Sequence, residues 1–385
     1  YKRQDETPTP TIAETIPSEE PLVPTPTEIP PTEVPPTEPP AEPTGTQAPE
    51  PTAEPSPTQE IDQPDTTGMV LNVPAPGSGA PSGTATTIIS VRTGPSLDYP
   101  VYGLLLENQP AELVGRSEDG EWWAINVPGV PLDQGWVFSA YVETANAAGV
   151  AAIQPPPVPP ELVFAFISSE SDSPFVRFRE TVYAHSGPGR DYPAYGVIKQ
   201  GQEARAVYET EDGLWYQIVV QSNLVPTKQA WVPAPFMELR RAGLVSIASA
   251  QPVPEAAELP APESGAPSGV PMTPIYLRSG PDISYPVNGV APGRNPVEIT
   301  AVSPNLEWYQ VRVPQPVSLD GLAWVSAPFV AASGAVSAPV IEPPAIAAEV
   351  ATFEPGAGDS WARPLEHIFV FAGPGNEYPL SLIHI

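Results

Sequence analysis

The chain of 385 residues contains no cysteine and only three histidines, His185, His367 and His384. The absence of cysteine excludes disulfides, thiolate metal sites and a cysteine nucleophile, and it leaves the redox compartment open. Long apolar runs are also missing. The longest apolar cluster, residues 162–167, is far shorter than the roughly 18 residues that a membrane span needs, so we predict no membrane span.

Basic residues are scarce. The chain has 16 Lys and Arg against 45 Asp and Glu, which gives a formal net charge of −29. A surface this acidic is repelled by the phosphates of nucleic acids and by anionic lipids, so we predict no nucleic-acid partner.

The most informative feature that is present is a repeat of 93 residues. A Gly-Pro pair recurs with its glycine at Gly94, Gly187, Gly280 and Gly373. A Tyr-Pro pair follows each glycine by five residues, at Tyr99, Tyr192, Tyr285 and Tyr378. This period predicts tandem copies of one small unit. We expect glycine here because it tolerates both positive φ and the restriction that a following proline imposes.

Aromatic residues mark the first three copies. A pair follows the glycine by 28 residues, at Trp122-Trp123, Trp215-Tyr216 and Trp308-Tyr309. One further tryptophan closes each copy, at Trp136, Trp231 and Trp324. The fourth copy ends twelve residues after Gly373 and lacks these tryptophans, so we predict that it cannot fold alone.

The N-terminal part, residues 1–85, has a different composition. Its first 67 residues contain 18 Pro, 14 Asp or Glu and two basic residues, and no aromatic lies between Tyr1 and Tyr99. Such a segment has little to bury, so we predict a disordered, extended stalk rich in Pro, Thr and Glu. Its threonines could carry O-linked sugars, or the segment could be a plain linker.

Short apolar runs broken by Gly, Pro, Asn or Asp, without helical periodicity, predict an all-β fold. The predicted small barrels occupy residues 86–143, 175–239 and 272–331. Flexible linkers rich in Pro and Ala are expected at 144–174, 240–271 and 332–366, with the truncated fourth copy at 367–385. Linkers of this composition suggest that the barrels move independently.

Alternation along one strand of each copy separates two faces. In residues 122–127, Trp123, Ile125 and Val127 share the apolar face, which we predict to be the core. Trp122 shares the other face with polar residues. The first tryptophan of each pair is therefore either a platform for a sugar ring or a peptide, or a core residue covered by a loop. The candidate ligand-binding residues are Trp122, Trp215 and Trp308. The closing tryptophans look structural, and the aromatics after them, Tyr141, Phe236 and Phe329, look like core.

The order of these motifs resembles the bacterial SH3 (SH3b) family. Residues 91–95 (Val-Arg-Thr-Gly-Pro) and 277–281 (Leu-Arg-Ser-Gly-Pro) are similar to its opening, and residues 135–137 (Gly-Trp-Val) to its close. The second copy departs from the pattern, with His185 in place of Arg. The resemblance implies small SH3-like barrels of five to seven strands that serve outside the cytoplasm as targeting or adhesion modules, most often for peptidoglycan. It transfers no ligand residues.

Catalysis is not expected. His185 stands in one copy only and is predicted to be a solvated surface residue, and the paired acids fall in turns or in the stalk. No calcium-loop spacing is present, so we expect neither a metal nor a cofactor. We therefore predict a monomeric, non-enzymatic, extracytoplasmic protein that binds peptidoglycan or a peptide through several modules. The alternatives are a spacer or protein-interaction array, and the targeting arm of a cell-wall hydrolase. Because the chain begins at Tyr1, we expect a signal peptide or anchor upstream.

Overall fold

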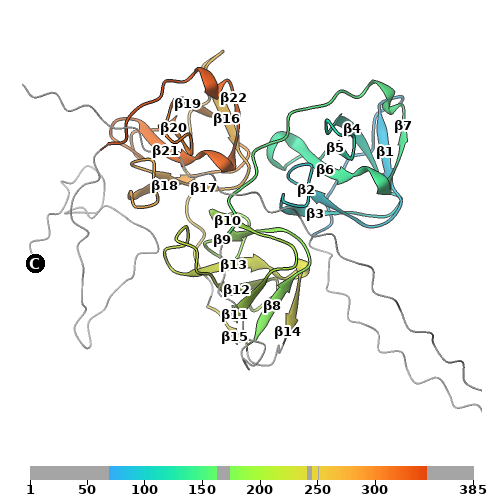
Figure 1. Ribbon diagram of the computed structural model, residues 1–385, viewed down its shortest axis with the longest axis horizontal. Coiled ribbons are helices and arrows are strands. Elements are labelled where there is room, and N and C mark those ends of the chain that lie inside the picture. Colours follow the sequence, from blue (N-terminus) through green and yellow to red (C-terminus); the bar gives the residue numbers. More distant parts are fainter. Residues whose placement is uncertain (1–68, 163–173, 241–244, 250, 345–385) are drawn as a thin grey trace, which may run out of the picture. The chain divides into compact units, whose positions relative to one another are not determined.

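The computed structural model describes residues 69–162, 174–240, 245–249 and 251–344. Within these residues the chain is all-β, with three separate sheets (Figure 1) and only single turns of 3-10 helix. This confirms the predicted all-β class. Most of the predicted stalk, residues 1–68, and the fourth copy, residues 367–385, lie outside the described residues. In the part of the chain that the structure describes, no helix is long and apolar enough to cross a membrane.

The first repeat unit is built from seven strands. They are β1 (Ser82–Ala85), β2 (Ile89–Arg92), β3 (Val101–Leu105), β4 (Pro110–Arg116), β5 (Trp122–Asn126), β6 (Gln134–Phe138) and β7 (Val142–Ala145). Neighbouring strands pair antiparallel in the order β3-β2-β6-β5-β4-β1-β7. Its 3-10 turns are η2 (Pro131–Asp133), η3 (Ser139–Tyr141) and η4 (Ala147–Gly149).

The second and third units repeat this strand order. The second contains β8 (Phe175–Phe178), β9 (Val182–His185), β10 (Ala194–Ile198), β11 (Glu203–Glu209), β12 (Trp215–Val219), β13 (Gln229–Pro233), η5 (Ala234–Phe236), β14 (Met237–Arg240) and β15 (Ser246–Ile247), which pairs parallel with β11. The third contains β16 (Ser268–Pro271), β17 (Ile275–Arg278), β18 (Val287–Ala291), β19 (Val297–Val302), β20 (Trp308–Arg312), β21 (Leu322–Ser326), η7 (Ala327–Phe329), β22 (Val330–Ser333) and η8 (Ala335–Ser337).

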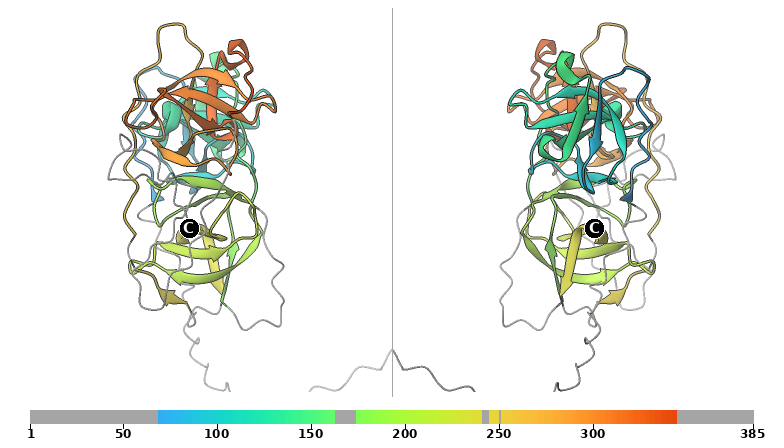
Figure 2. Two further views of the ribbon diagram at one scale, coloured as in Figure 1. Left: turned by 90° about the vertical axis from the view of Figure 1, so that its left-hand side faces the viewer. Right: turned by 90° about the vertical axis from the view of Figure 1, so that its right-hand side faces the viewer.

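The strands of each unit curl around an interior, as the ribbon views in Figure 2 show for the second unit. Two of the apolar clusters extend across a junction: that of the second unit includes Met69 and Val101, and that of the third includes Tyr183, Ala194 and Val197. The core of the first unit holds Val91, Leu105, Ile125, Val127 and Val137, all nearly inaccessible to solvent. The equivalent residues of the second unit are Ala184, Ile198, Ile218, Val220 and Val232, and those of the third are Leu277, Ala291, Val311, Val313 and Val325. The predicted apolar face of the aromatic strand is therefore the core face.

Two predictions about the edges of the units need correction. Strand β1 begins at Ser82, inside the segment predicted as stalk up to residue 85, because its backbone pairs with both β4 and β7. Tyr141 is 50% exposed and packs against Phe138 on the surface, so it is not a core residue, whereas Phe236 and Phe329 are buried as predicted.

The segments between the units are not free tethers where the structure describes them. One residue upstream of each unit forms an isolated parallel bridge with a strand of that unit: Val70 with Leu104 of β3, Glu161 with Val197 of β10 and Ala256 with Val290 of β18. Val70 precedes the first unit, and the other two lie between units. The backbone N–H of Leu162, for example, donates to the carbonyl of Val197 at 2.9 Å. Extended, Pro-rich backbone still offers carbonyls and the remaining N–H groups to a sheet edge. At these residues the segments are therefore hydrogen-bonded to a sheet edge, and their flexibility elsewhere stays a prediction.

Candidate functional site

The three predicted ligand-binding tryptophans lie one in each unit and do not come together. Trp122 is 6% exposed and forms a small cluster with Ala124, Trp136 and Ile153, apart from the main core. Its ring meets Phe138 edge to face, with 5.3 Å between centroids. The prediction that Trp122 faces away from the core is confirmed. The segment after the first unit covers it through Ile153, so a wide stacking platform is not open there.

The other two tryptophans differ from Trp122 in their surroundings. Trp215 is also buried, and its ring contacts His185 edge to face at 5.6 Å. Trp308 is half-buried. The ligand-binding role of the three residues stays a prediction, and among them Trp215 alone lines the cavity described below.

Neighbouring units touch through the same backbone contact at each junction. The N–H of Val101 donates to the carbonyl of Thr181 at 2.9 Å, and 93 residues further on the N–H of Ala194 donates to the carbonyl of Pro274 at 3.0 Å. These hydrogen bonds join neighbouring units in the described structure, and the independent motion of the units stays a prediction. Composition could not reveal these contacts because they are made by backbone atoms.

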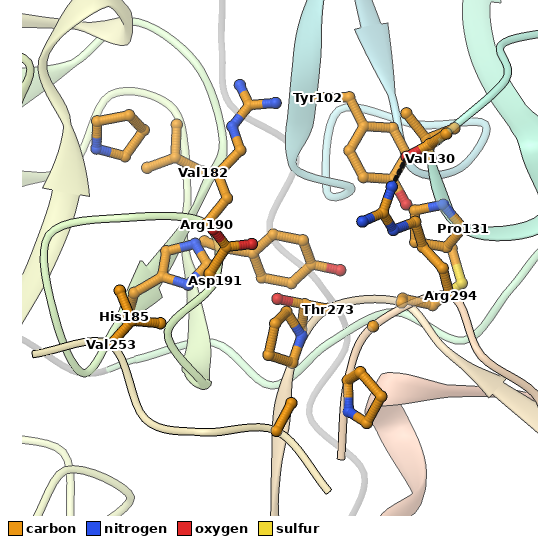
Figure 3. Close-up of a pocket in the computed structure, with 18 of the residues that line it drawn as sticks. Tyr102, Val130, Pro131, Val182, His185, Arg190, Asp191, Val253, Thr273 and Arg294 are labelled. Atoms are coloured by element: carbon orange, nitrogen blue, oxygen red, sulfur yellow. Dashed lines mark hydrogen bonds between the residues drawn. The ribbon is translucent and has the colours of Figure 1, made fainter. Parts of the chain in front are cut away.

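Side chains distinguish the two junctions. At the first, Arg92 forms an ion pair with Glu180, which also accepts a hydrogen bond of 2.8 Å from Ser90. The residues at the same positions of the second junction are His185 and Thr273. These side chains are shorter and form no ion pair. A cavity of about 540 Å³ lies at the second junction, between residues of all three units (Figure 3).

The cavity wall combines an apolar surface with a few polar groups. Val101, Val182 and Met272 contribute apolar atoms, together with several prolines. The charged side chains that line it are Arg190, Asp191 and Arg294, all with substantial exposure at the mouth. The Arg190 guanidinium lies 2.9 Å from the sulfur of Met69, and Arg294 donates to the carbonyl oxygen of Gly129.

Two buried tyrosines, Tyr102 and Tyr183, are part of this wall. Tyr102 is 8% exposed and Tyr183 is 7% exposed, and neither hydroxyl has a hydrogen-bond partner. Burial raises the pKa of Tyr102 well above its ordinary value, Tyr183 adds to the rise, and Arg190 and Arg294 oppose it. Burial also raises the pKa of Tyr183, although the nearby Thr93 hydroxyl lowers it without reaching hydrogen-bond geometry. Both phenols are therefore protonated donors at neutral pH.

His185 is buried in the wall, contrary to the prediction of a solvated surface residue. It is 4% exposed, and its Nδ1 lies 2.8 Å from the carbonyl oxygen of Tyr192. The guanidinium of Arg92 makes the equivalent contact to Tyr99, so the position serves the same turn in each unit. Burial lowers the pKa of His185 to about 4, against the opposing effect of the Tyr192 carbonyl, and Arg190 lowers it further. The imidazole is thus neutral, and Nδ1 carries the proton because a carbonyl only accepts.

Sequence reasoning missed this cavity, although the repeat carried a signal for it. Its two arginines stand where the copies differ from one another. Arg190 replaces Leu97 and Ile283 of the other copies, and Arg294 replaces Asn108 and Gly201. Comparison of the copies position by position would have singled out these arginines. Across the described residues, no group of three or more His, Asp or Glu side chains could hold a metal ion.

No known family model and no curated protein matches the chain. Among solved structures, the chain is similar at a low level to NlpC1 from Trichomonas vaginalis, with 6% identity over 68% of this chain and 95% of that one and a TM-score of 0.15. NlpC2 from the same organism gives 7% identity over 64% and 91% of the two chains, with a TM-score of 0.14. At these scores the likeness carries no argument about fold or activity.

Proposed function

We propose that the protein is a non-enzymatic binding protein of the cell envelope, in which three SH3-like barrels act together and the ligand is peptidoglycan or a short peptide. The observation that carries this proposal is the cavity of about 540 Å³ at the junction of the units. Ligand pockets have volumes of roughly 300–1,000 Å³ and combine apolar walls with a few polar groups. The identical strand order of the three units supports the barrel assignment, and the sequence resemblance supports a place outside the cytoplasm.

The backbone hydrogen bonds between neighbouring units argue against the alternative of a passive spacer. A string of spacers needs no defined junction, whereas Val101 and Ala194 repeat one hydrogen bond at both junctions. The cavity also combines hydrogen-bond donors with a neutral histidine and an apolar surface, an arrangement that suits the binding of a ligand.

The test is co-sedimentation of the full chain with purified, insoluble peptidoglycan. We expect the wild-type chain to sediment, and Arg190→Leu with Arg294→Gly to lower the bound fraction, since both changes remove cavity charge. Arg177→Ala with Arg205→Ala is the matched control, because these exposed arginines lie on β8 and β11. Absence of wild-type sedimentation would overturn wall binding and favour the spacer.

A further inference from the structure

The cavity is the one place on the described surface where two unpartnered buried phenols meet two arginines in a strongly acidic protein. The chain carries a net charge of −29. With neutral His185, the charged side chains of the cavity are Arg190, Arg294 and Asp191, which leaves one net positive charge. A local cationic site focuses the field toward anions while the rest of the surface repels them.

The backbone at Arg294 strengthens this inference. Its φ is +78°, in the left-handed region, and the residues at the same position of the other copies are Asn108 with φ +62° and Gly201 with φ +85°. Asn and Gly adopt this conformation readily, whereas arginine there is unfavourable. The turn therefore does not require arginine for its folding, and the guanidinium instead lines the cavity and donates to the carbonyl oxygen of Gly129.

The hydroxyls of Tyr102 and Tyr183 have no hydrogen-bond partner. A buried hydroxyl without a partner costs about 1–3 kcal/mol, which folding alone would not select. Tyr102, Tyr183, Arg190 and Arg294 all line the same cavity. The position of Tyr183 holds Ser90 in the first copy and Tyr276 in the third, and that of Tyr102 holds Tyr195 in the second copy and Asn288 in the third, so neither phenol is present in every copy.

The rest of the cavity wall indicates which kind of molecule carries the anionic group. It is apolar and proline-rich, which suits an uncharged body rather than a highly hydrated inorganic ion. His185 donates from Nδ1 to Tyr192 and keeps Nε2 as an acceptor, and Asp191 is a second acceptor, so N–H groups of a ligand also find partners. A peptide end supplies an anion, N–H groups and apolar side chains in one molecule.

We propose that this cavity binds the free carboxylate end of a short peptide, with Tyr102, Arg190 and Arg294 contacting the carboxylate. The inference rests on the proposed binding function and names its ligand class. It fits charge-assisted hydrogen bonds to a planar carboxylate, for which arginine is well suited.

Calorimetric titration of the full chain tests it with three probes: N-acetyl-alanyl-alanine as the free acid, the same dipeptide as its C-terminal amide, and inorganic phosphate. We expect the acid to bind and the amide to bind at least about tenfold more weakly, because a charge-assisted hydrogen bond is lost. Equal affinity for acid and amide would overturn the carboxylate assignment. Phosphate binding as tightly as the acid would show an anion site only and would overturn the peptide assignment, and no binding of the acid would overturn the proposal.

Substitutions that introduce the residue found at the same position of another copy should leave the fold intact. Arg294→Gly introduces the residue that the second copy has at this position, Gly201, and Arg190→Leu introduces the residue of the first copy, Leu97. Each variant should bind the acid about tenfold more weakly. Tyr102→Phe should weaken binding while leaving the thermal midpoint unchanged or higher, since the lost hydroxyl has no partner. Unchanged affinity in all three would overturn the proposal. Wall co-sedimentation that persists when dipeptide binding fails would overturn this site and leave the proposed function standing.

Discussion

The hydroxyl of Tyr99 donates a hydrogen bond of 2.6 Å to the carbonyl oxygen of Pro156, in the segment that leads out of the first unit. The contact recurs in the other units, where Tyr192 donates to Gln251 and Tyr285 donates to Pro344, each at 2.5 Å. The tyrosine of each Tyr-Pro pair thus fastens the segment that follows its own unit some 57–59 residues later.

Loss of the Tyr99 hydroxyl should release this segment. Pro156 is buried, so Tyr99→Phe leaves its carbonyl without the phenol donor, and we expect a loss of about 1 kcal/mol in the free energy of unfolding. Urea unfolding measures this loss, and limited proteolysis should cut residues 150–160 faster. Tyr141→Phe is the control, since Tyr141 is 50% exposed. Equal protease sensitivity of Tyr99→Phe and wild type would contradict the fastening role.

The Gly-Pro glycine should tolerate no side chain. A Cβ built at Gly94 would lie 2.4 Å from the ring of Tyr99, and the same clash occurs at Gly187 and Gly280 with their tyrosines. Gly94→Ala should therefore destabilise the first unit by about 1–3 kcal/mol, the usual effect of overpacking. Gly149→Ala meets nothing within 4 Å and should change stability by less than about 0.5 kcal/mol. Similar thermal midpoints for the two variants would show that the ring can move aside.

This glycine illustrates what the sequence could predict and what it could not. The 93-residue period and the alternation in residues 122–127 predicted the repeated units and their core face, because burial of apolar side chains follows a period of two along a strand. The reason for Gly94 was wrong: its φ is not positive, and the tyrosine ring five residues later demands the absence of Cβ. That requirement is a contact across a folded loop, which composition does not encode.

The candidate site was hidden for a related reason. The cavity depends on which side chains meet across a junction, such as Arg92 with Glu180, and residues 88 positions apart show no local pattern. In the sequence, the cavity is indicated only by differences between equivalent positions of the copies, such as Glu180 and Thr273. His185 was misjudged because its single occurrence indicated a dispensable surface residue, whereas the turn buries that position in every unit.

Breaking the ion pair at the first junction should be costly. Glu180→Gln leaves the nearly buried guanidinium of Arg92 without its countercharge. Because 22% of the Glu180 side chain is exposed, we expect about 2 kcal/mol, below the 3–5 kcal/mol of a fully buried pair. Glu118→Gln, at an exposed turn, is the control and should have little effect. Urea unfolding compares the two.

A double variant asks whether the two junctions are interchangeable. Arg92→His with Glu180→Thr installs the His185–Thr273 combination at the first junction, so no unpaired charge stays buried. It should recover at least half of the stability that Glu180→Gln loses. A double variant less stable than Glu180→Gln would mean that the ion pair contributes more than neutralisation of one charge.

Acid should weaken the second unit through His185. Its pKa is about 4 in the folded chain and 6.5 as the ordinary value, so below pH 6.5 the unfolded chain binds a proton that the folded chain does not. Stability from this group is therefore complete above pH 6.5, and it falls as the pH drops from 6.5 toward 4. The loss approaches about 1.4 kcal/mol per pH unit at the steepest part of that range.

The variant His185→Gln isolates this effect from the many carboxylates that titrate in the same range. Glutamine can still donate to the Tyr192 carbonyl but takes up no proton. Thermal midpoints measured between pH 7 and pH 4 should fall less steeply for His185→Gln than for wild type, and the two curves should run parallel above pH 7. Parallel curves throughout would mean that the imidazole reaches solvent and titrates normally. The comparison also reports on the cavity, because His185 can stay neutral beside Arg190 only while its wall remains closed around the ring.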